Sequence, residues 1–122
     1  MTWDLNNDRP IYAQIVEKIE MQIVSGYYKP GDKLPSVREL AAEAGVNPNT
    51  MQKAFGELER SELIVTQRTS GRVVTEDGAL IQNIKADIAK EQIKIFFDKM
   101  KELGFEVEET MALIESAAKE VL

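Results

Sequence analysis

Residues 30–74 constrain the fold of this chain more than any other segment, because helix-capping and turn signals follow one another there at close spacing. Ser36 stands three residues before Glu39, which is the arrangement of a capping box at the start of a helix. Gly45 can adopt the left-handed backbone that ends this helix, and Asn47 can cap a second helix two residues later. Two capped helices joined by so short a glycine turn are typical of a helix-turn-helix.

Two strand-like runs follow the second of these helices. Residues 63–66 read Leu-Ile-Val-Thr, residues 72–75 read Arg-Val-Val-Thr, and the five residues between them include Arg68 and Gly71. β-Branched residues on both sides of a turn that contains glycine predict a β-hairpin. A helix-turn-helix followed by a hairpin is a winged helix-turn-helix, and its second helix is shaped to enter the major groove of DNA.

One more helix precedes this motif. Pro10 suits the first turn of a helix, and apolar residues recur at helical spacing along Ile11–Ser25, before Gly26 interrupts the pattern. Pro48 suits the first turn of the second motif helix in the same way. We therefore expect helices over residues 11–25, 36–44 and 48–61, and strands over residues 63–66 and 72–75.

The chain continues with two helical stripes, one from Gly78 to Leu103 and one over Val107–Val121, with Gly104 between them. Two such helices cannot bury their apolar faces alone, and the simplest partner is the same pair from a second subunit. The fold class we predict is mainly α with a small β-hairpin: a winged helix-turn-helix domain over residues 1–76 and a two-helix C-terminal dimerisation region over residues 77–122. The expected dimer interface contains Ile81, Ile84, Ile88, Ile95, Phe96, Met100, Leu103, Met111 and Ile114.

The composition excludes several classes of function. The 122 residues contain no Cys and no His, which removes disulfides, thiolate zinc sites and the commonest general base. The carboxylates, lysines and tyrosines form no recognisable catalytic motif, so we expect no enzyme, no catalytic residue, no metal site and no cofactor. No apolar run can span a membrane, and the N-terminus lacks the pattern of a secretory signal. We therefore expect a cytoplasmic protein with no membrane partner.

The net charge of −6 is unusual for a DNA-binding protein until it is divided along the chain. Residues 1–75 contain nine Lys and Arg against ten Asp and Glu, whereas residues 76–122 contain six against eleven. The acidic excess lies mostly in the C-terminal region. That distribution indicates an acidic surface that faces away from DNA.

Several short motifs resemble those of one known family. They are Pro10-Ile11-Tyr12-x-Gln14-Ile15, Ile23-x-Ser25-Gly26, Pro30-Gly31-x-Lys33-Leu34-Pro35-Ser36-x-Arg38-x-Leu40-Ala41 and Asn47-Pro48-Asn49-Thr50. With these spacings the chain resembles the GntR family of bacterial transcription regulators from Pro10 to Val74, and the short two-helix tail resembles the YtrA-like subfamily. The resemblance implies a homodimeric regulator, most often a repressor, frequently encoded beside an ABC transporter operon.

The chain also departs from the family pattern at a few positions. Glu62 stands where the family often has Gly, Arg72 stands where Thr is common, and Thr69-Ser70-Gly71 replaces a wing tip with two glycines. Many members carry Arg in the first turn of the recognition helix, where this chain has Pro48 and Asn49. The DNA bases that those members prefer therefore give no prediction of the bases that this chain recognises.

The candidate DNA-binding residues lie on both motif helices, in the turn before them and on the hairpin. Arg38 matches family positions that touch a phosphate or a guanine, although a surface Arg paired with Glu39 or Glu43 is the alternative. Asn and Gln can bond adenine in the major groove, Lys and Arg bind phosphate, and capping alone can explain Ser36. Tyr12 could reach the DNA backbone as well. We predict DNA contacts from Lys33, Ser36, Arg38, Asn47, Asn49, Thr50, Gln52, Lys53, Arg68, Gly71 and Arg72.

These observations favour a sequence-specific DNA-binding transcriptional regulator that acts as a homodimer on a pseudo-palindromic, double-stranded DNA operator. Two alternatives stay open: a winged-helix adaptor that binds protein, and a non-specific architectural DNA binder. Phe96, Phe97 and Met100 could line a pocket for a small effector, although the pattern favours a dimer core. No residue names such an effector.

Overall fold

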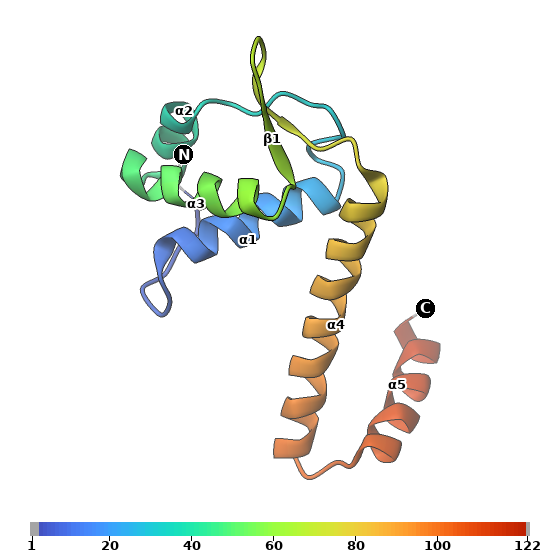
Figure 1. Cartoon of the computed structure of the whole chain (residues 1–122). Helices are drawn as coiled ribbons and strands as arrows, with labels where there is room; N and C mark the ends of the chain where they lie inside the picture. The colour runs from blue at the N-terminus through green and yellow to red at the C-terminus, as the bar shows by residue number, and fades with distance from the viewer. Residues whose placement is uncertain (1–2, 122) are drawn as a thin grey trace. The chain divides into compact units, whose positions relative to one another are not determined.

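The structure is a computed structural model that describes residues 3–121. Within these residues it contains five helices and one two-stranded antiparallel hairpin (Figure 1). The chain divides after Ile84 into two compact units. The predicted fold class, mainly α with a small β-hairpin, is confirmed.

Helix α1 (Ile11–Val24) forms the floor of the N-terminal unit, where it packs against α3 (Pro48–Arg60). Its buried residues Ile15, Ile19 and Ile23 lie four residues apart, as the apolar stripe predicted. Pro10 is the N-cap residue rather than part of the first turn, because its backbone is extended (φ −51°, ψ 134°). Gly26, just past the end of the helix, has the left-handed φ of +89° that lets the chain turn away.

Helix α2 (Val37–Ala44) and helix α3 form the helix-turn-helix, and their predicted caps are confirmed. The Ser36 hydroxyl accepts a hydrogen bond from the Glu39 backbone N–H, and the Glu39 carboxylate accepts one from the Ser36 N–H, both at 3.1 Å. Gly45 has a φ of +75° in the turn. The Asn47 side chain accepts from the Asn49 backbone N–H at 2.7 Å, which fixes the start of α3.

Strands β1 (Ile64–Gln67) and β2 (Gly71–Val74) form the wing, each displaced by one residue from the predicted position. Their register pairs Thr66 with Arg72. Backbone bonds from Leu34 N–H to Arg72 C=O and from Val74 N–H to Asp32 C=O, both 2.9 Å, attach the segment before α2 to the free edge of β2. This attachment covers a strand edge that would otherwise be unpaired, and it places Lys33 beside the wing.

The hydrophobic core of the N-terminal unit lies between the three helices and the base of the wing. Helix α4 (Gly78–Glu102) contributes Ile81 to this core, and Ile84 packs against it half-buried. We expected a boundary at residues 76–77, but the compact unit extends to Ile84 because these two side chains join the core. The remaining buried core residues are Ile15, Ile19, Ile23, Leu34, Leu40, Ala41, Ala44, Met51, Ala54, Phe55, Leu58, Leu63, Ile64 and Val74.

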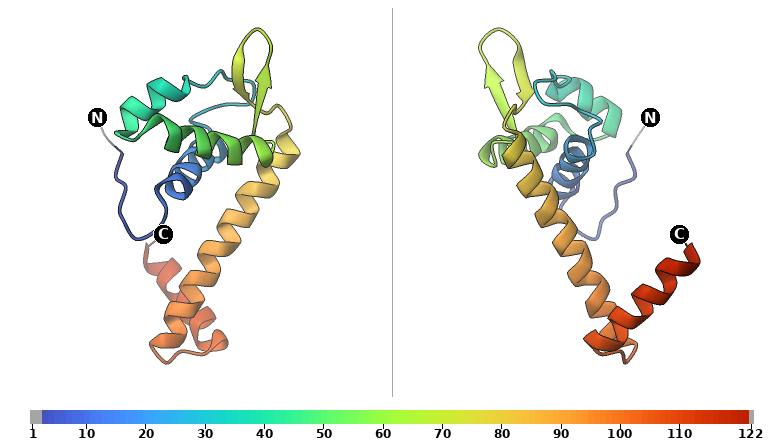
Figure 2. Two further views of the ribbon diagram at one scale, coloured as in Figure 1. Left: turned by 60° about the vertical axis from the view of Figure 1, so that its left-hand side comes forward. Right: turned by 90° about the vertical axis from the view of Figure 1, so that its right-hand side faces the viewer.

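The second unit consists of the rest of α4 and helix α5 (Val107–Val121), which turns back after the end of α4 (Figure 2). Gly104 makes the turn with a φ of +98°, and the Phe105 N–H donates to the Met100 C=O at 3.0 Å. Within residues 3–121, no helix combines the length and the apolarity needed to cross a lipid bilayer.

Candidate nucleic-acid interface

A groove of about 610 Å³ lies between the N-terminal end of α2, the exposed face of α3 and the wing. Six of the predicted DNA-binding residues line it, and they come from four separate segments of the chain. Its floor includes the ring of Phe55 from α3. The predicted residues in the groove are Lys33, Ser36, Arg38, Gln52, Gly71 and Arg72.

The charge of this groove is opposite to that of the whole chain. Its charged lining residues are three basic ones, Lys33, Arg38 and Arg72, and one acidic one, Glu39. The Glu39 carboxylate already accepts a hydrogen bond from the Ser36 backbone N–H, and this bond lowers the pKa of the Glu39 carboxyl below its ordinary value. A basic groove on an otherwise acidic protein favours a polyanionic ligand.

The N-terminal turn of α3 carries three further predicted residues. Asn49 is exposed, Thr50 is half-buried, and the Asn47 side chain is already engaged as the helix cap. Asn47 and Thr50 line a second hollow, of about 390 Å³, together with Trp3, Leu5 and Ile11. Asn49 is thus the residue of this turn that is most free to meet a ligand.

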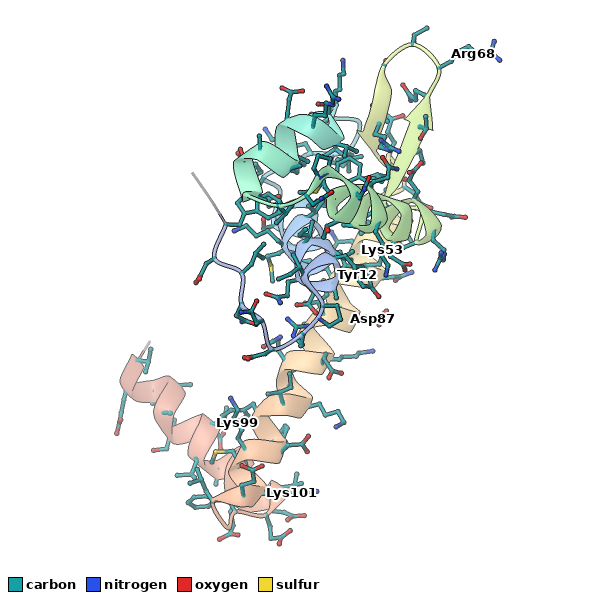
Figure 3. The ribbon with its side chains drawn as sticks, turned by 90° about the vertical axis from the view of Figure 1, so that its left-hand side faces the viewer. Tyr12, Lys53, Arg68, Asp87, Lys99 and Lys101 are labelled. Atoms are coloured by element: carbon teal, nitrogen blue, oxygen red, sulfur yellow. The ribbon has the colours of Figure 1, made fainter. Side chains whose placement is uncertain are left out.

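Lys53 and Arg68 are not among the residues that line the groove. The Lys53 ammonium lies 4.0 Å from the centroid of the Tyr12 ring of α1, a cation–π contact that holds the lysine near the surface of α3 (Figure 3). Tyr12 and Lys53 were both candidates for contact with DNA, and the structure brings them together. Arg68 extends from the tip of the wing (Figure 3).

Arg72 lies on strand β2, one pair away from the tip of the wing, and its side chain contacts α3. Its Nε donates to the Glu59 carboxylate at 3.1 Å, and its guanidinium carbon lies 5.1 Å from the centroid of the Phe55 ring. The same carboxylate accepts a hydrogen bond from the Thr66 hydroxyl at 2.7 Å. Sequence reasoning missed Glu59, although it shares a helix face with Gln52 and Phe55, which lie seven and four residues before it.

The predicted dimer residues fall into three groups in the structure. Ile81 is a buried core residue of the N-terminal unit, and Ile84 packs half-buried against that core. Ile88 and Met100 are half-buried. The other five are exposed: Ile95, Phe96, Leu103, Met111 and Ile114.

Residues 11–74 match the family model described as bacterial regulatory proteins, gntR family. The chain is 38% identical over 120 residues to the HTH-type transcriptional repressor YtrA of Bacillus subtilis, which covers 97% of this chain and 92% of that protein. This chain belongs to the GntR family. Because the likeness to YtrA extends through the two-helix tail, the chain belongs to the YtrA-like subfamily.

Solved structures of GntR-type proteins are similar to this chain in fold. A GntR family transcriptional regulator from Listeria monocytogenes matches with a TM-score of 0.83 and 44% identity, covering 92% of this chain and 98% of that one. The DNA-binding domain of AraR in complex with operator ORX1 matches with a TM-score of 0.53 and 32% identity, covering 62% of this chain and 92% of that one. The winged helix-turn-helix interpretation is thus confirmed, and the family is one of transcriptional regulators and not of enzymes.

Proposed function

We propose that this GntR-family regulator binds a pseudo-palindromic operator as a homodimer and represses transcription. The observation that carries the proposal is the basic groove, where six predicted DNA-binding residues from α2, α3, the wing and the segment before α2 line one surface. In this arrangement the exposed face of α3, with Asn49, Gln52 and Lys53, enters the major groove. The basic residues beside it bind the phosphates, which supply much of the affinity.

The tail provides the surface for dimerisation. Of residues 85–121, Thr110 alone is fully buried, so these two helices leave none of their large apolar side chains fully covered on their own. Large apolar side chains stay exposed along the tail. Among them are Phe96 on α4, Leu103 directly after α4, and Met111 on α5. Exposed apolar surface of this extent is typical of a protein interface. A two-fold pairing of these tails would cover it and present two copies of α3 to successive major grooves.

The repressor role and the regulated genes rest on the resemblance to the YtrA-like subfamily. The relative YtrA is itself named as a transcriptional repressor. We propose that the operator of this chain lies upstream of an ABC transporter operon. Deletion of the regulator should then raise the transcript of that operon, and an unchanged or lower transcript would contradict repression.

Selection of bound duplexes from a random pool tests the DNA-binding part of the proposal. The full-length protein should enrich an inverted repeat whose half-sites are centred about one helical turn apart, roughly 10 bp, or somewhat further. Enrichment of no sequence would favour an architectural binder, and failure to retain any duplex would favour a protein-binding adaptor. The variant Lys53→Ala should fold normally and bind the enriched duplex more weakly, whereas unchanged affinity would remove Lys53 from the interface.

A further inference from the structure

The wing is tied to the recognition helix by one carboxylate. Glu59, near the C-terminal end of α3, accepts hydrogen bonds from Thr66 on β1 at 2.7 Å and from Arg72 on β2 at 3.1 Å. Thr66 and Arg72 are direct cross-strand partners, so their side chains leave the same face of the hairpin. Both strands of the wing are therefore fastened to the helix at the same point.

Two contacts fix the orientation of the Arg72 guanidinium. Glu59 binds its Nε, and the guanidinium lies over the ring of Phe55, with its central carbon 5.1 Å from the ring centroid. Both side chains of the ion pair are largely shielded from solvent, with exposed fractions of 27% for Arg72 and 32% for Glu59. A shielded pair of this kind keeps its geometry better than a pair on the open surface.

The guanidinium has donors left over. Arg carries five N–H donors in a planar fork, and the hydrogen bond to Glu59 uses the one at Nε. Within residues 3–121, the terminal nitrogens of Arg72 make no hydrogen bond to another side chain, and Arg72 lines the basic groove. One edge of the fork is thus held by a carboxylate, while the other donors are free for an anion in the groove.

We propose that Glu59 is a positioning residue for DNA binding, which holds Arg72 so that its terminal nitrogens bind a phosphate of the DNA backbone. This inference rests on the proposed function. It assigns a favourable role in DNA binding to an acidic residue, although the negative charge of that residue repels DNA. A carboxylate near DNA repels phosphates, so its removal should strengthen binding if it does nothing else. If Glu59 positions Arg72, its removal should instead weaken binding.

The experiment measures the affinity of full-length protein for the duplex enriched by selection, over a series of salt concentrations. The Glu59→Gln variant should bind about three- to tenfold more weakly than wild type, in the range expected when one charged contact is disturbed. The Arg72→Met variant keeps an unbranched apolar side chain over Phe55 and should bind about tenfold more weakly. The slope of the logarithm of its binding constant against the logarithm of the salt concentration should become less steep by about 0.9, the value for one lost phosphate contact.

Glu57→Gln is the matched control. Like Glu59, Glu57 lies on α3 and forms an ion pair, in its case with Arg60 of the same helix at 2.9 Å. Within the described chain it makes no hydrogen bond to the wing. Its substitution should leave the affinity unchanged or slightly higher. In the Arg72→Met background, Glu59→Gln should no longer weaken binding, because the residue that it positions is gone. Thermal unfolding of each variant confirms that it is folded at the temperature of the titration.

Three results would overturn the proposal. The first is a Glu59→Gln variant that binds as tightly as wild type or more tightly. The second is an Arg72→Met variant with lower affinity but an unchanged salt slope, since the ion pair would then only clamp the wing. The third is equal weakening by Glu59→Gln with and without Arg72. If the wild-type protein retains no duplex, the proposed function fails instead.

Discussion

The side-chain amide of Gln14 pairs with both backbone groups of Asn6. Its oxygen accepts from the Asn6 N–H at 3.0 Å, and its nitrogen donates to the Asn6 C=O at 2.8 Å and to the Arg9 C=O at 2.9 Å. Gln14 is buried in α1, so these bonds satisfy an amide that water cannot reach. This one residue fixes the segment before α1 to the N-terminal unit.

Replacement of Gln14 by Glu should destabilise the protein. The substitution exchanges a donor for an acceptor opposite two carbonyl oxygens, and the cost of such an unsatisfied buried group is about 1–3 kcal/mol. Denaturant unfolding at neutral pH measures the change in the free energy of unfolding. Gln82→Glu, the same change at an exposed position of α4, should alter it by less than about 0.5 kcal/mol. Equal effects of the two substitutions would contradict the role given to Gln14.

Replacement of Glu62 by Gly should stabilise the protein. Glu62 precedes the wing with a φ of +70°, and it is the one residue other than glycine with a left-handed backbone between residues 3 and 121. Glycine adopts this conformation without the steric cost, so we expect a gain of about 1 kcal/mol in the free energy of unfolding. Glu57→Gly, at a position of α3 with ordinary helical backbone, should lower it by about the same amount. A loss of stability in Glu62→Gly would show that the side chain contributes more than the strain costs.

Two acidic residues of α1 should respond to pH in opposite directions. Burial, with a contribution from the charge of Glu17, raises the pKa of the Glu20 carboxyl, whereas the hydrogen bond from Arg9 lowers the pKa of Glu17. A raised pKa in the folded state means that the ionised form is destabilising at neutral pH. Glu20→Gln should therefore raise the midpoint of thermal unfolding at pH 7, and Glu17→Gln should lower it.

The ordinary pKa of Glu in an unfolded chain is about 4.3. The Glu20→Gln difference should shrink as the pH falls through the raised folded-state pKa of Glu20 toward this value, and the Glu17→Gln difference should shrink as the pH falls below it, through the lowered folded-state pKa of Glu17. The Arg9–Glu17 pair is bidentate, at 2.6 and 2.8 Å, but exposed to solvent, so the effect of Glu17→Gln should be small. Differences of the same sign for the two variants, or differences that persist unchanged at pH 3, would contradict these assignments.

A charge on the exposed apolar surface of the tail should prevent dimerisation. Phe96 is 42% exposed on α4 although it is a large aromatic residue. Phe96→Asp should shift the sedimentation behaviour from dimer to monomer, because a carboxylate buried in an apolar interface is strongly unfavourable. Asn83→Asp, at an exposed position of α4 on roughly the opposite side of the helix from Phe96, introduces the same charge and should leave the dimer intact. A wild-type protein that sediments as a monomer would contradict the dimer outright.

The elements of the fold could be predicted from the sequence because their signals are local. The capping box at Ser36, the left-handed Gly45 and the cap at Asn47 each depend on residues within one turn, and all three are confirmed. The hairpin was displaced by one residue per strand, since β-branched residues specify a strand better than they specify its ends. Its base is set by backbone bonds to the segment before α2, which lies far away in the sequence.

The candidate site was predicted by residue type but not by arrangement. Helical spacing placed Gln52 on the exposed face of α3, and the structure confirms that position, where Gln52 lines the groove. Its contact with DNA stays a prediction. The ion pair between Glu59 and Arg72 spans thirteen residues, so nothing in the local pattern distinguishes this arginine from the one at the wing tip. Ile81 was assigned to the tail by the continuity of its helical stripe, yet it packs into the N-terminal core.

The most direct test of the account is the affinity of Arg38→Ala for the duplex that the wild-type protein selects, measured by fluorescence anisotropy at about 150 mM salt. Arg38 is exposed and lines the basic groove, whereas Lys90, exposed on α4 in the acidic tail unit, serves as the control. We predict that Arg38→Ala binds at least about tenfold more weakly and that Lys90→Ala binds like wild type. Equal affinity of Arg38→Ala and wild type would contradict the assignment of this groove to DNA.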